Sequence, residues 1–167
     1  MGAELESAYI GEHQDTQRTT HVNEQSLLKA LVIGEDRDWE FKSARGGLPA
    51  SLWETYSAMA NTDGGVIVLG VEQHGDRFVI TGLSDPAKIR KAFWDTINNR
   101  GKVSINLLTD EQAQVRQVGS KSVLVVHVPR ASRHQRPVYV GQNPLTGTTA
   151  GTSRGITIAP NTRWAGN

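Results

Sequence analysis

The sequence predicts an α+β domain in which about three helices pack on a mixed sheet of about five to six strands. Apolar residues recur at helical spacing in 52–60 and 89–97, whereas short apolar or alternating runs occupy 38–42, 66–71 and 122–128. The chain has 167 residues and no internal repeat, so we expect a single domain with its own core.

The first helix should begin after Asn23, a typical N-cap, and end at Gly34, a typical stop. Its buried face would carry Leu27, Leu28 and Leu31, which recur at helical spacing. The pattern therefore predicts a short amphipathic helix at the start of the domain.

Residues 38–42 alternate between charged and apolar side chains. In a strand, Trp39 and Phe41 point to one face, whereas Glu40 and Lys42 point to the other. This pattern predicts a strand with one polar or functional face, followed by a flexible basic loop.

A second helix is expected from Pro49, because proline suits the first helical turn. Its apolar stripe consists of Leu52, Trp53, Tyr56, Met59 and Ala60. Trp53 and Tyr56 would stack on nucleic-acid bases if they were exposed, but their helical spacing favours packing in the core.

The stretch from Ala60 to Glu72 is the predicted centre of the sheet. Residues 66–71 form an apolar run typical of a strand buried on both faces, and Gly64-Gly65 supplies the turn before it. Gly70 within the run predicts a close approach by another backbone or by a ligand. Glu72 would then stand at the end of this strand.

The rest of the predicted domain is a hairpin, a helix and three strands. Residues 77–81 should pair with 66–72, and Ser84 or Asp85 should cap the helix that follows. The buried stripe of that helix is Ile89, Ala92, Phe93 and Ile97. The last strands are expected at about 103–108, 113–118 and 122–128.

Both ends of the chain differ from this domain, which we place at 23–140. Residues 1–22 show no periodicity and predict a disordered leader, and residues 141–167 form a Gly/Thr-rich tail that we expect to be mobile. No apolar run approaches the roughly 20 residues of a membrane helix, and no signal-peptide core is present. The chain has no cysteine, which excludes disulfides and thiolate metal sites, and we expect a cytoplasmic protein without membrane contact.

The net charge of +1 conceals an asymmetry along the chain. Residues 1–84 carry six basic and thirteen acidic residues, a net of −7, whereas residues 85–136 carry ten basic and four acidic residues, a net of +6. An acidic half beside a basic half is consistent with a nucleic-acid surface that contains an acidic site. Charges that are merely solvated would give the same totals.

Three glutamates are the candidate catalytic and metal-binding residues. Glu40 lies on the polar face of its predicted strand, Glu35 precedes that strand, and Glu72 ends a strand that would be its neighbour. Clustered carboxylates are the ligands that Mg²⁺ or Mn²⁺ prefers, and such a metal can activate water for phosphodiester cleavage. Lys42 would hold the phosphate beside them. Solvated surface glutamates are the alternative.

Basic residues outside this cluster would form the wall of a groove. They offer phosphate contacts without a sequence code, which predicts salt-sensitive binding with little base discrimination. The candidate contacts are Lys42, Arg45, Lys88, Arg90, Lys91, Arg116, Lys121, Arg130, Arg133 and Arg136. No P-loop is present, so nucleotide hydrolysis has no support.

Four blocks in order resemble the Schlafen-type AlbA domain: Glu35-x4-Glu40-Phe41-Lys42, residues 58–65, residues 68–72 and Gly82-Leu83. The resemblance runs from about Leu27 to Thr148. That domain stands at the N-terminus of many bacterial proteins described as transcriptional regulators or helicase-related proteins, and in animal Schlafens. It implies an α+β fold and nucleic-acid binding, either DNA or RNA.

The resemblance also implies an alternative function. In animal members that cut tRNA and rRNA, two glutamates five apart and a later aspartate bind the metal. Glu35 and Glu40 match the pair, and the third position falls on Glu72, a longer carboxylate that can still ligate. The alternative is therefore a Mg²⁺- or Mn²⁺-dependent endoribonuclease that cleaves structured RNA such as tRNA.

Two further expectations come from the resemblance. The animal nuclease builds its groove from two similar lobes, so this single lobe would pair as a homodimer. Residues 148–167 do not resemble the usual continuation in relatives, which is consistent with a truncated or frame-shifted end.

Three hypotheses remain: a binding domain without catalysis, a metal-dependent nuclease, and a protein-interaction domain. Convergence of Glu35, Glu40 and Glu72 on one point would favour the nuclease. Divergence, or pairing with Lys and Arg, would favour binding alone. An interaction domain would show no salt-dependent retention on nucleic acid.

Overall fold

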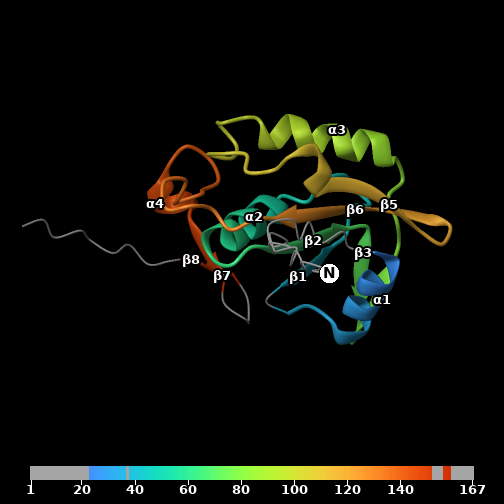
Figure 1. Cartoon of the computed structure of the whole chain (residues 1–167). Helices are drawn as coiled ribbons and strands as arrows, with labels where there is room; N and C mark the ends of the chain where they lie inside the picture. Colours follow the sequence, from blue (N-terminus) through green and yellow to red (C-terminus); the bar gives the residue numbers. More distant parts are fainter. Residues whose placement is uncertain (1–22, 37, 152–155, 159–167) are drawn as a thin grey trace, which may run out of the picture.

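A computed structural model describes residues 23–36, 38–151 and 156–158 (Figure 1). The elements are, in order, α1 (Glu24–Ile33), β1 (Trp39–Lys42), α2 (Ser51–Asn61), β2 (Gly65–Leu69), β3 (Val71–His74), β4 (Arg77–Ile80), α3 (Pro86–Ile97), the 3₁₀ turn η1 (Asp110–Gln112), β5 (Ala113–Val118), β6 (Lys121–Val128), α4 (Pro144–Gly147), β7 (Thr149–Gly151) and β8 (Ile156–Ile158). The predicted leader at 1–22 and most of the predicted tail after 151 lie outside the described residues.

The α+β class is confirmed, and the strands are divided among three pairings. A four-stranded sheet has the order β1-β2-β6-β5, in which β1 is parallel to β2 and the other neighbours are antiparallel. The hairpin β3–β4 and the short pair β7–β8 are separate. The mixed sheet therefore has two open edges, β1 and β5.

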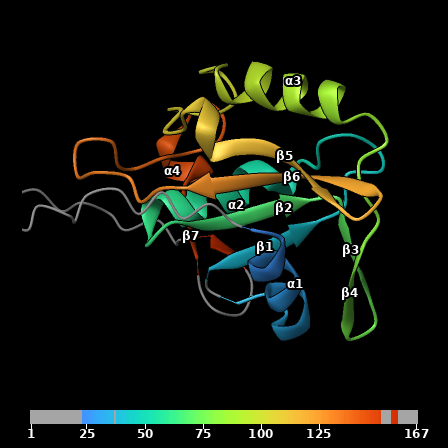
Figure 2. The ribbon, with the colours of Figure 1, turned by 45° about the vertical axis from the view of Figure 1, so that its right-hand side comes forward.

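The four-stranded sheet is buried on both faces. Residues from α2 and α3 pack on one face, around Tyr56, Phe93 and Ile67. Residues from α1 and from the hairpin pack on the other, around Leu27, Val68 and Phe78. Figure 2 shows α1 and the hairpin on the opposite side of the sheet from α3.

The predicted helices are confirmed, with one change in burial. Asn23 caps α1 by accepting from the Ser26 amide, and Asp85 caps α3 by accepting from the Lys88 amide. In α1, however, Leu28 is 44% exposed, because Leu27 and Ala30 fill the face toward the sheet.

The two aromatic residues of α2 lie in the core, as their spacing predicts. Trp53 stacks on Phe93 with ring centroids 5.4 Å apart. The Tyr56 hydroxyl donates to the Ile105 carbonyl and accepts from the Leu107 amide, and burial raises the pKa of Tyr56 to about 12. Neither ring is available for base stacking.

The predicted central strand is two strands with a bend at Gly70. Gly70 has a φ of +103°, and a Cβ at this position would lie 3.2 Å from the Gly82 backbone, so the expected close approach is present. The chain leaves the four-stranded sheet at this bend. Glu72 therefore belongs to the hairpin, which pairs only Val71–His74 with Arg77–Ile80.

The strand predicted at 103–108 is wrong. Within it, only Val103 forms a bridge, to Val140. The Ser104 amide still donates to the Tyr139 carbonyl, but further along Leu107 donates to the Tyr56 hydroxyl and Leu108 to the Asn106 side chain. Side-chain acceptors have replaced a strand ladder here.

No helix in the described ranges is long and apolar enough to span a membrane.

Candidate functional site

The edge of β1 is closed by acidic side chains. The Asp38 and Lys42 carbonyls accept bonds from the β2 side, so the Trp39 and Phe41 amides face away from the sheet. Glu35 Oε1 accepts from the Phe41 amide at 3.0 Å, and Asp36 Oδ1 accepts from the Trp39 amide at 3.1 Å. Glu35 thus supplies an acceptor that the open edge of the sheet lacks.

Glu40 and Lys42 form an ion pair beside this edge. Lys42 Nζ lies 2.9 Å from Glu40 Oε1, and only 10% of the Lys42 side chain is exposed. Burial raises the pKa of Glu35, and the nearby Glu40 charge adds to this, whereas the Phe41 amide and Lys42 oppose it. Glu35 and Glu40 are therefore electrostatic neighbours.

Glu72 is held by partners of its own. The Ser43 hydroxyl donates to Oε1 at 2.8 Å, and Arg45 Nε lies 2.8 Å from the same oxygen. His74 Nε2 lies 3.4 Å from Oε2. The Ser43 hydrogen bond lowers the pKa of Glu72, with further help from His74 and Arg45.

The three glutamates do not form a ready ligand set. In the part of the chain that the structure describes, no group of three or more His, Asp or Glu side chains is placed to hold a metal ion. Glu40 is paired with Lys42, and both oxygens of Glu72 have partners of their own. These carboxylates are therefore occupied by side chains of the protein rather than directed at a shared cation. In this arrangement the donor set does not fit Mg²⁺ or Mn²⁺.

The predicted basic contacts divide into paired and unpaired residues. Lys121 donates to the Ile80 carbonyl at 2.7 Å. The ion pairs are Lys42–Glu40, Arg45–Glu72, Arg90–Asp110, Lys91–Asp95 and Arg130–Asp63. Of the predicted contacts, those that form no ion pair with a described residue are Lys88, Arg116, Lys121, Arg133 and Arg136.

These basic residues do not share one groove wall. Arg116 lies opposite Val123 on the sheet face covered by α1, whereas α3 packs on the other face. Arg116 also lines a groove of about 670 Å³ between α1 and the sheet. That groove contains more acidic than basic side chains, since its charged lining is Lys29, Arg116, Asp36, Asp38, Asp63 and Glu111.

Two basic residues that the sequence reasoning missed lie in the loop after α3. Arg100 and Lys102 are exposed, and neither has an ion pair within the described ranges. The Gly141 amide donates to the Lys102 carbonyl, which joins this loop to the end of the basic connector, here defined as residues 129–141. A signal was present in the sequence, because residues 96–109 contain Arg100 and Lys102 and no Asp or Glu.

The block that most resembles the family has a structural role. Asn61 Nδ2 donates to the Val138 carbonyl and Asn61 Oδ1 accepts from the Val138 amide, both at 2.8 Å. The Ala131 amide donates to the Ala60 carbonyl. At Gly64 (φ +85°) a Cβ would lie 2.6 Å from the Val128 carbonyl oxygen. The block therefore fastens the basic connector to the end of α2.

Comparisons with known proteins agree with this fold. The family model described as Schlafen, AlbA_2 matches residues 35–149. A solution structure from Nitrosomonas europaea, the N-terminal domain of a protein described as related to the ATP-dependent DNA helicase RecG, is 30% identical. The similarity covers 87% of this chain and 95% of that domain, with a TM-score of 0.65. No curated protein matches the chain. The chain therefore belongs to the Schlafen AlbA_2 family.

Proposed function

We propose that this domain binds nucleic acid mainly through the sugar–phosphate backbone. The observation that carries the proposal is the separation of charge. The acidic candidates Glu40 and Glu72 are neutralised within the protein, whereas Arg133 and Arg136 have no ion pair among the described residues. Unpaired arginines on an exposed connector are suited to phosphate oxygens, which carry charge without sequence information.

The family and the structural relative support the same function. The relative's domain stands at the N-terminus of a protein described as helicase-related. In a protein of that kind, contacts to the sugar–phosphate backbone would hold an attached catalytic domain on nucleic acid without selecting a base sequence. A role within a transcriptional regulator would use the same contacts.

Binding can be tested by fluorescence anisotropy with labelled DNA and RNA, as duplexes and as single strands, over a salt series. We expect log K to fall linearly with log salt, and base sequence to have little effect. Absence of salt-dependent binding to every probe at low salt would instead favour a protein-interaction domain.

The endoribonuclease is the second candidate. Its support is the proximity of Glu35 and Glu40, and the pairing of Glu40 with Lys42 and of Glu72 with Arg45 weighs against it. Incubation of tRNA and single-stranded DNA with Mn²⁺ separates the two functions. Cleavage that is lost in Glu40→Ala would establish the nuclease, whereas binding without cleavage would leave the binding function alone.

A homodimer would supply the second lobe that an RNA groove of the animal type requires. Sedimentation velocity with and without RNA tests this proposal. A strictly monomeric protein that binds RNA tightly would contradict it.

A further inference from the structure

One end of the domain presents cations and amide NH₂ groups, and the oxygens of the same amides accept hydrogen bonds from within the protein. We propose that this surface, formed by residues 98–102, 132–136 and 142–143 and here called the donor face, contacts the phosphodiester backbone of nucleic acid. The inference rests on the proposed function and assigns it to one surface. Figure 1 shows the loop after α3 and the connector on the same side of the domain as α4.

The cations of the donor face are exposed and unneutralised. Arg100, Lys102 and Arg133 are all exposed, and none forms an ion pair within the described ranges. Asp63, which follows α2, lies 3.5 Å from Arg130 of the connector and is engaged by it. Since no acidic residue follows Glu111 in the sequence, the connector brings no carboxylate of its own.

The amide side chains of the donor face accept hydrogen bonds from within the protein through their carbonyl oxygens. Asn99 Oδ1 accepts from the Gly101 amide at 2.9 Å, and Gln135 Oε1 accepts from the Ser132 amide at 3.0 Å. Asn98 Oδ1 accepts from Asn106, and Asn143 Oδ1 accepts from the Leu145 amide.

Each of these four exposed amides therefore has its carbonyl oxygen engaged within the protein and keeps an NH₂ group that can donate to a ligand. Phosphate oxygens can only accept. Cations and NH₂ groups together match a row of phosphates better than they match a surface of mixed donors and acceptors.

The donor face is held in place by backbone hydrogen bonds. The Lys102 amide donates to the Asn99 carbonyl, and the Gly141 amide donates to the Lys102 carbonyl, both at 2.8 Å. The Asn61 side chain is hydrogen-bonded to both the amide and the carbonyl of Val138. A surface ordered before binding loses less entropy when a ligand arrives.

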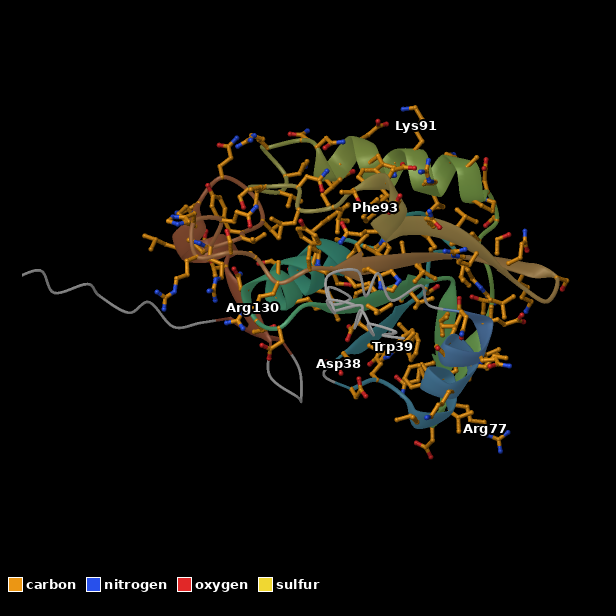
Figure 3. All side chains as sticks on the ribbon, viewed as in Figure 1. Asp38, Trp39, Arg77, Lys91, Phe93 and Arg130 are labelled. Carbon is orange, nitrogen blue, oxygen red and sulfur yellow. The ribbon has the colours of Figure 1, made fainter. Side chains whose placement is uncertain are left out.

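Other basic positions lack this combination. On α3, Arg90 and Lys91 are bound to Asp110 and Asp95. At the opposite end, Arg77 on β4 lies far from Arg130 and the connector (Figure 3). These positions supply matched controls.

The test compares two double variants of the full chain that remove the same charge. Arg100→Gln with Lys102→Gln alters the donor face, and Arg77→Gln with Lys29→Gln alters the opposite end. Anisotropy is measured with labelled DNA duplex, RNA duplex and single strands over a salt series. Thermal melting of both variants checks the fold.

We expect the donor-face variant to bind roughly tenfold more weakly, with a salt slope smaller by about 1.8 on duplex DNA and about 1.4 on single strands. The control should match the wild type. Which probe shows the larger loss distinguishes DNA from RNA as the source of the phosphates.

Equal losses in the two variants, or a loss only in the control, would overturn the assignment while leaving nucleic-acid binding in place. Failure of the wild type to bind any probe would instead refute the proposed function, and the assignment with it. Competition by poly-glutamate as effective as that by nucleic acid would also overturn it, since the surface would then select charge rather than phosphate.

Discussion

The three glutamates around β1, Glu35, Glu40 and Glu72, are here called the carboxylate edge. This region and the donor face at the connector differ in whether their charges are paired within the protein. At the edge, Glu35 accepts from the Phe41 amide, Glu40 is paired with Lys42, and Glu72 is held by Ser43 and Arg45. At the donor face, Arg100, Lys102 and Arg133 have no such partners among the described residues. One region satisfies its charges within the chain, and the other leaves them for a ligand.

This difference separates residues that serve the fold from residues available for binding. A carboxylate already bonded to an edge amide or to a lysine gains less from a cation, because it must first give up that contact. An exposed arginine or amide NH₂ exchanges only water for phosphate. The three glutamates, which are the sequence feature most suggestive of a nuclease, therefore lie in the region whose charges are already paired within the protein.

The largest effect should come from Asn61→Ala, which removes the clamp between α2 and the connector. The substitution leaves the Val138 amide without its acceptor at 2.8 Å, whereas the Val138 carbonyl keeps the Ser57 hydroxyl as a donor, so we expect a loss of roughly 1–3 kcal/mol in unfolding free energy. Urea unfolding measures the loss. Nucleic-acid binding should weaken in the same variant, since the connector is no longer fixed.

Gln73→Ala is the control for this prediction, because Gln73 is an exposed amide on β3, outside the donor face. Its loss in unfolding free energy should stay below about 0.5 kcal/mol, and its nucleic-acid binding should match the wild type. Equal destabilisation by the two variants would show that the Asn61 clamp contributes no more to stability than an exposed amide.

The second prediction separates an edge cap from a metal ligand at Glu35. Glu35→Ala leaves the Phe41 amide without its acceptor at the strand edge and should cost about 1 kcal/mol. Glu35→Gln keeps an oxygen acceptor and should unfold near the wild-type urea concentration. If both variants were as stable as the wild type, the capping role would be wrong.

Much of the fold could be predicted from local sequence patterns. The points where a predicted strand bends or fails to form depend on tertiary contacts. The caps at Asn23 and Asp85 and the buried stripe of α2 could be predicted because each depends on residues within one helix. The bend at Gly70 depends on Gly82, twelve residues later, and the failure of 103–108 to form a strand depends on Tyr56. Periodicity carries no information about such partners.

The candidate site was predictable as a set of residues but not as an arrangement. The motif identified Glu35, Glu40 and Glu72, yet the positions of Lys42 and Arg45 against two of them come from the fold. Arg100 and Lys102 were missed because they lie between the predicted helix and the strand predicted at 103–108, and neither pattern includes them. Their proximity to the connector arises from the bridge between Val103 and Val140.

The third prediction concerns a single cation of the donor face. Arg133→Gln should reduce the salt slope of binding by about 0.9 on duplex DNA, the value for one phosphate contact. Stability should not change, since Arg133 has no ion pair among the described residues. Lys91→Gln is the matched control, and it should leave the slope unchanged because Lys91 is paired with Asp95.

The smallest effect is an opposite pH dependence at two carboxylates of the edge. The pKa of Glu72 lies below its ordinary 4.5 in the folded protein, so Glu72 stabilises the fold above that pH, and the contribution is lost as pH falls through the lower value. The pKa of Glu35 is raised, so Glu35 lowers stability as pH rises from 4.5 through the raised value.

Glu72→Gln should therefore reduce the unfolding free energy at neutral pH, with the difference from wild type vanishing in acid. Glu35→Gln should change the same profile with the opposite sign, because it removes a partly buried charge and keeps an acceptor for Phe41. Urea unfolding of the three proteins across a pH series measures both curves. Profiles of the same sign would mean that Glu35 and Glu72 share one environment, and a common cation site would then regain support.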